Sequence, residues 1–71
     1  MDLQFLERLC KQGDFKNVQK FCSENKLTKK DIYRNDGYES PFDYAYMKGH
    51  FEICKFFVLQ YDITKEDILF I

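Results

Sequence analysis

Three cysteines and one histidine are the side chains of this 71-residue chain best suited to metal binding or nucleophilic catalysis. His50 and Cys54 are four positions apart, a spacing that places both on one face of a helix, as zinc ligands can be. Cys10 or Cys22 would have to converge on them to complete a zinc site. The closely paired cysteines typical of zinc sites do not occur in the sequence. A zinc protein that uses these four residues is therefore less expected than either an interaction module or a self-associating fragment.

A cysteine nucleophile would also need a base within hydrogen-bonding reach and a third group that orients this base. The chain has a single histidine, only three glycines and no glycine-rich loop that could cradle a phosphate. Its carboxylates are scattered, and no pair of them suggests acid–base catalysis. We expect no enzyme and no cofactor.

Length and charge exclude further classes of function. A chain this short forms one domain at most, which would span residues 1–71. Its 11 basic and 12 acidic residues give a net charge of -1, with no basic stripe for a nucleic-acid backbone. No apolar run approaches the roughly 20 residues that span a membrane. The odd number of cysteines and the absence of a signal pattern indicate a soluble protein in a reducing compartment.

The sequence contains one unit twice, at a spacing of 36 residues, so that residues 1–36 form the first repeat and residues 37–71 the second. The residues that match are glycines, phenylalanines and one six-residue block: Gly13 with Gly49, Phe15 with Phe51, Phe21 with Phe57, and LTKKDI (Leu27 to Ile32) with ITKEDI (Ile63 to Ile68). Internal repeats at such periods are typical of stacked helical arrays.

Each unit is predicted to form two short helices separated by a glycine. The expected helices span residues 3–12, 15–25, 41–48 and 51–60, with Gly13 and Gly49 at the left-handed positions that end helices. Ser40 followed by Pro41 is a favoured helix start. The T-x-x-D patterns at Thr28 and at Thr64 resemble capping boxes, and each predicts a short extra helical turn.

Aligning the two units predicts that the cysteines pack in the core. Cys54 falls on Val18, Cys22 on Val58 and Cys10 on Tyr46, so each cysteine takes the place of a residue that fills apolar space. His50 falls on Asp14 at the start of a helix, where a capping or loop-bonding role is expected.

Two groups of residues in the second unit follow a known pattern. Ser40, Pro41, Phe42 and Ala45 match T-P-L-H-x-A, and Gly49 to Ile53 match G-H-x-E-[IV] at the right spacing. The chain therefore resembles the ankyrin repeat family, with a looser likeness to the divergent arrays of large DNA viruses and amoebae. Asp43 holds the position of the family's histidine, and the spacing is 36 rather than 33.

The resemblance implies an all-α fold, an α-solenoid of two stacked helix-turn-helix repeats with short helical turns in the connecting loops. It also implies a cytoplasmic protein–protein interaction module, whose concave helix and loop surface binds a protein of unknown identity. The expected partner-binding residues are Arg8, Lys11, Gln12, Tyr33, Tyr38, Glu39, Tyr44, Met47 and Lys48. The alternative is a structural or self-associating fragment of a longer array that docks through its apolar end at Ile68 to Ile71, where a second copy would form a homodimer.

Overall fold

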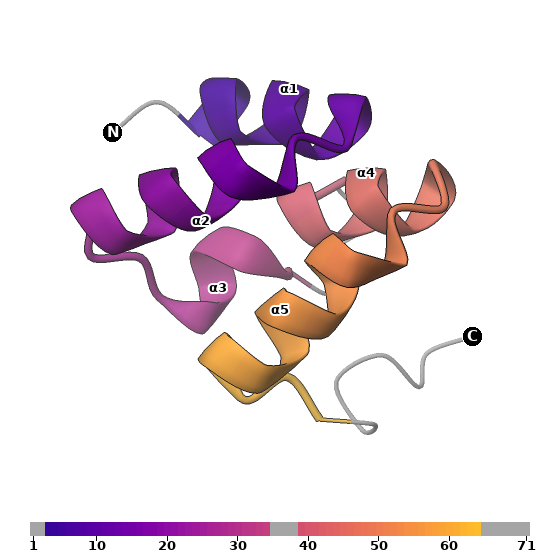
Figure 1. The fold of residues 1–71 in the computed structure, drawn as a ribbon. Coiled ribbons are helices and arrows are strands. Elements are labelled where there is room, and N and C mark those ends of the chain that lie inside the picture. The colour runs from indigo at the N-terminus through magenta and orange to yellow at the C-terminus, as the bar shows by residue number, and fades with distance from the viewer. Residues whose placement is uncertain (1–2, 35–38, 65–71) are drawn as a thin grey trace.

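The computed structural model describes residues 3–34 and 39–64, and within these ranges every regular element is an α-helix (Figure 1). The five helices are α1 (Leu3–Gln12), α2 (Phe15–Glu24), α3 (Lys29–Ile32), α4 (Pro41–Met47) and α5 (Phe51–Tyr61). The predicted all-α class is confirmed, and the four predicted main helices agree with the observed ones to within one residue. The second T-x-x-D turn, at Asp67, lies outside the described residues.

The turn from α1 to α2 and the turn from α4 to α5 have the same geometry. Gly13 has φ 75° and Gly49 has φ 76°, which a residue with a side chain rarely adopts. The next residue in each turn donates its N–H to the carbonyl oxygen five positions earlier: Asp14 to Leu9 at 3.1 Å, and His50 to Ala45 at 2.9 Å. This is a Schellman ending in both places, so the two glycines are equivalent, as the repeat predicts.

Side chains fix the starts of α3 and α4. The Asp43 carboxylate accepts hydrogen bonds from both the backbone N–H and the hydroxyl of Ser40, each at 2.8 Å. Asp31 accepts from the backbone N–H of Thr28 at 2.8 Å in the same way. The capping box predicted at Thr28 is confirmed, and Ser40, predicted as a helix start, forms a second one with Asp43. Asp43 thus bonds the cap hydroxyl from the position where the ankyrin pattern has a histidine.

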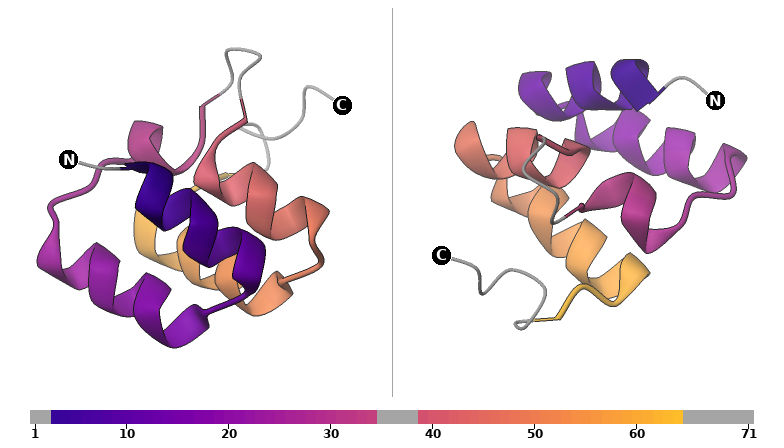
Figure 2. Two further views of the ribbon diagram at one scale, coloured as in Figure 1. Left: turned by 90° about the horizontal axis from the view of Figure 1, so that it is seen from above. Right: turned by 180° about the vertical axis from the view of Figure 1, so that it is seen from behind.

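The two helical hairpins lie side by side. Helix α1 packs against α2 within the first hairpin and α4 against α5 within the second, while α1 also contacts α4 and α2 contacts α5 (Figure 2). The short helix α3 connects the hairpins and packs on α4 and α5. One buried cluster joins all five helices: Leu6, Leu9, Cys10, Val18, Ile32, Tyr33, Phe42, Ala45, Ile53, Cys54, Phe57 and Ile63.

Two side chains of the second hairpin, His50 and Phe56, contact the first hairpin. The Nε2–H group of His50 donates to the backbone carbonyl oxygen of Lys11 at 3.1 Å. The Phe56 ring meets the Phe15 ring edge-on, with centroids 5.9 Å apart. These contacts fix α5 against the end of α1 and the start of α2. They therefore help to hold α1 and α4, the first helices of the two hairpins, as neighbours.

Candidate interaction surface

Cys10 and Cys54 belong to the hydrophobic core, and Cys22 packs against it half-buried. Cys10 is fully buried and Cys54 nearly so. Burial raises the pKa of the Cys10 thiol to about 12, with smaller contributions from Cys22, Cys54 and Glu7. The thiolate, which is the nucleophile and the metal ligand, is therefore strongly disfavoured at neutral pH. The predicted packing role of these cysteines is confirmed for Cys10 and Cys54.

His50 is occupied by its hydrogen bond to the Lys11 carbonyl, so its loop-bonding role is confirmed. Its side chain does not cap α5. Within residues 3–34 and 39–64, no three histidine, cysteine, aspartate or glutamate side chains come together in a way that could hold a metal ion.

Helices α1 and α4 present most of the predicted partner-binding residues to solvent. Arg8, Lys11 and Gln12 are exposed on α1, and Met47 is exposed at the end of α4. Because α1 and α4 lie side by side, the surfaces of these two helices adjoin (Figure 2). We call this region the outer face and define it by the following residues: Arg8, Lys11, Gln12, Glu39, Tyr44, Met47 and Lys48.

A contact between Lys11 and Tyr44 bridges the two helices of the outer face. The Lys11 Nζ atom lies 4.4 Å from the centre of the Tyr44 ring, within the range of a cation–π interaction. A hydrogen bond to Glu39 raises the pKa of the Tyr44 hydroxyl, and partial desolvation and the charges of Glu39, Glu7 and Asp43 add to this effect. Tyr44 thus has a cation over its ring and the Glu39 carboxylate at its hydroxyl.

Tyr33 was predicted as a partner-binding residue because its packing was not evident, but the structure places it in the core. Its side chain is 5% exposed and packs edge-on against Phe42, with ring centroids 5.4 Å apart. It directly follows α3, which carries it into the space under α4. Tyr33 therefore offers no side-chain surface to a partner. The predicted contribution of Tyr38 lies outside the described residues.

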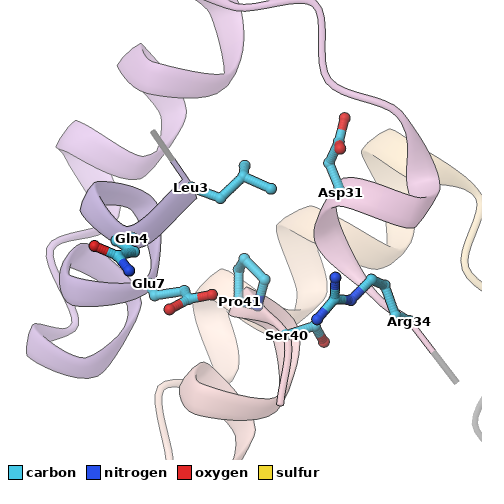
Figure 3. A pocket seen from close by; sticks show the side chains of 7 residues that line it. All are labelled: Leu3, Gln4, Glu7, Asp31, Arg34, Ser40 and Pro41. Atoms are coloured by element: carbon cyan, nitrogen blue, oxygen red, sulfur yellow. The ribbon is translucent and has the colours of Figure 1, made fainter. Parts of the chain in front are cut away.

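A groove opens between α1, α3 and the start of α4, with a cavity volume of about 360 Å³ (Figure 3). Leu3 and Pro41 give it an apolar floor, and Glu7, Asp31 and Arg34 supply charge. Its complete lining is Leu3, Gln4, Glu7, Asp31, Arg34, Ser40 and Pro41. The sequence did not indicate this groove, because its residues come from three segments that only the packing of the hairpins brings together.

Glu7 links the groove to the outer face. It lines the groove, and its charge is one of the smaller causes of the raised pKa of Tyr44 on the outer face.

Comparison with protein-family models, with curated proteins and with solved structures finds no match to this chain. Among the helices of the described residues, none combines the length and the apolar character that crossing a bilayer requires.

Proposed function

We propose that this chain is a non-catalytic protein–protein interaction module that binds a partner protein on the outer face and in the adjoining groove. The observation that carries the proposal is the Lys11–Tyr44 contact, because it joins two helices from different hairpins into one surface. A surface built on packed helices loses little conformational entropy when it binds, and this favours recognition.

The chemistry of the outer face suits a protein partner. It combines an aromatic ring, an exposed methionine and an arginine, residue types that are enriched at protein interfaces. Its charges have both signs, since Arg8, Lys11 and Lys48 are basic and Glu39 is acidic. Such a surface gives little attraction to a uniformly charged nucleic-acid backbone, which requires clustered basic residues.

We also propose that the two hairpins are ankyrin-type repeats of an α-solenoid. The proposal rests on the motif residues from Ser40 to Ile53, on the two equivalent glycine turns and on the side-by-side packing of α1 with α4 and α2 with α5. In such solenoids the helices of successive repeats stack and create an extended binding surface.

Affinity capture from the organism that encodes the chain tests the proposed function. The bait is the wild type, the variant Arg8→Ala/Lys48→Ala on the outer face, or the variant Lys16→Ala/Lys20→Ala on α2. Each double variant removes two exposed positive side chains, so the two are matched in charge. We expect that the wild type and the α2 variant retain the same proteins. The outer-face variant should bind them about tenfold or more weakly, a loss of about 1.4 kcal/mol in binding free energy. Equal retention by both variants, or retention of no protein, would contradict the proposal.

A further inference from the structure

Exposed apolar side chains gather on the second hairpin. Five large apolar residues are well exposed in the described residues: Phe5, Tyr46, Met47, Phe51 and Leu59. Four of them belong to α4 and α5, with exposed fractions of 59% for Tyr46, 56% for Met47, 65% for Phe51 and 74% for Leu59. We call these four residues the end face.

The residues 36 positions earlier face the second hairpin. Cys10, equivalent to Tyr46, is fully buried, and Phe15, equivalent to Phe51, packs against Phe56 of α5. The carbonyl of Lys11, equivalent to Met47, accepts the hydrogen bond from His50. Ser23 is equivalent to Leu59, and it lines the space between α2 and α5 together with Phe56 and Gln60. The end face is thus the second hairpin's counterpart of the surface that the first hairpin turns toward the second, where Cys10 is buried, Phe15 is half-buried, and Lys11 and Ser23 stay exposed.

The two glycine turns show the same difference. A Cβ atom added to Gly13 would lie 2.6 Å from the His50 ring, whereas one added to Gly49 would have, apart from its chain neighbours, no atom of the described residues within 4 Å. The covered position in the first hairpin is therefore uncovered in the second.

The opposite end of the molecule is polar. The second hairpin covers the first through His50, Phe56 and Gln60, and the equivalent positions in the first hairpin hold Asp14, Lys20 and Glu24. If a second copy stacked head to tail, its Asp14 carboxylate would meet the Met47 carbonyl. At the equivalent place within the chain, His50 donates a hydrogen bond to the Lys11 carbonyl. Two acceptors repel each other, and Lys20 and Glu24 would be buried against apolar rings. Head-to-tail stacking of copies is therefore unfavourable.

We propose that the end face binds the end face of a second copy, related by a two-fold axis, to form a homodimer. In such an isologous contact each copy contributes the same patch, so apolar surface meets apolar surface. The two copies together bury Tyr46, Met47, Phe51 and Leu59 of each chain. Met47 belongs to both surfaces, so the dimer takes this residue from the outer face and leaves its other residues and the groove available. Glu52 and Lys55 are exposed on α5 beside these residues, and they give the patch charges of both signs that a two-fold axis can pair.

The exposed apolar area of the end face suits a weak dimer. Tyr46 and Phe51 are aromatic side chains that present about 150–250 Å² each, and Met47 and Leu59 are somewhat smaller, so these four residues, exposed by more than half, leave on the order of 500 Å² uncovered. Two copies then bury about 1,000 Å², which is the lower limit of specific interfaces. A net charge of -1 per chain gives little repulsion between copies. We expect dissociation at roughly 10–100 µM, an affinity of about 5.5–7 kcal/mol.

Sedimentation equilibrium of the full chain over a concentration series tests this dimer. The wild type is expected to shift from monomer to dimer, and Leu59→Glu and Phe51→Glu are each expected to weaken the dimer by about tenfold or more because a charge would be buried. Phe5→Glu is the matched control, since it makes the same change at an exposed apolar residue on α1 and should leave the dimer unchanged. Circular dichroism of each variant verifies that it is folded.

Three results would overturn the proposal. The first is a wild type that stays monomeric at about 1 mM, ten or more times the expected dissociation constant. In that case, a loss of monomer stability in Leu59→Glu would indicate that residues 65–71 of the same chain cover the end face. The second is growth beyond the dimer, which would indicate head-to-tail assembly. The third is a dimer that Leu59→Glu and Phe51→Glu leave intact.

Discussion

The imidazole of His50 lies directly on Gly13, and it donates a hydrogen bond to the carbonyl oxygen of Lys11 at 3.1 Å. A histidine at the start of a helix in the second hairpin thus covers the bare turn of the first. The glycine allows both the positive φ angle of the turn and the close approach of the ring. This contact gives the single histidine of the chain a packing role between the two hairpins.

Gly13→Ala is predicted to destabilise the fold more than Gly49→Ala. Both glycines have φ near 75°, where an alanine costs about 1–2 kcal/mol. Only at Gly13 would the new Cβ meet a ring, and rotating that ring away breaks a hydrogen bond with a net value of about 1 kcal/mol. Urea unfolding of the two variants should therefore differ by about 1 kcal/mol or more. Equal losses of stability would show that His50 does not cover Gly13.

Asp43→Ala is predicted to cost more stability than Asp31→Ala. Each aspartate caps a short helix, and the loss of such a cap costs about 1 kcal/mol. Ser40 is 1% exposed, so Asp43→Ala leaves a buried N–H and a buried hydroxyl without their acceptor, whereas Thr28 is exposed to water. Buried unsatisfied groups add about 1–3 kcal/mol. Thermal unfolding of both variants tests the order, and the reverse order would contradict the observed cap geometry.

Stability is predicted to fall as the pH rises above about 9. The pKa of Cys10 is raised from 9.0 to about 12 in the folded chain, chiefly by burial. Below pH 9 the thiol is protonated in both states and titration changes nothing. Between pH 9 and 12 the unfolded chain releases the proton while the folded chain retains it, so the free energy of unfolding falls by about 1.4 kcal/mol per pH unit.

Cys10→Ala is the control for this prediction. Cys22 and Cys54, whose pKa values burial also raises, keep their own contributions to the slope. The free energy of unfolding of Cys10→Ala should decline less steeply with pH than that of the wild type, whatever its absolute value. An unchanged slope would mean that Cys10 titrates normally in the folded chain.

The sequence was sufficient to predict the helices because their ends depend on local chemistry. Gly13 and Gly49 adopt conformations that few other residues can, and Ser40 and Thr28 each have an aspartate three positions later. These signals lie within a few residues of the structure that they determine. The 36-residue repeat then predicted that equivalent glycines occupy equivalent turns.

The surfaces were harder to predict because they depend on which hairpin covers which residue. Tyr33 was expected at the surface but packs under α4, since its environment is set by the position of α3. Lys11 and Tyr44 are 33 positions apart, and nothing local indicates that they touch. The repeat aligns Phe51 with Phe15, yet Phe51 is 65% exposed whereas Phe15 is half-buried. The difference arises because a second hairpin lies against Phe15.

The central claim is that the two hairpins of the chain stack with His50 over Gly13. An NMR measurement of proton–proton proximity tests this claim most directly. Nuclear Overhauser effects are expected between the ring protons of His50 and the α-protons of Gly13, because Cε1 of the ring lies 2.6 Å from where a Cβ of Gly13 would be. A folded chain that shows the contacts within each hairpin but none between His50 and Gly13 would contradict the stacked arrangement.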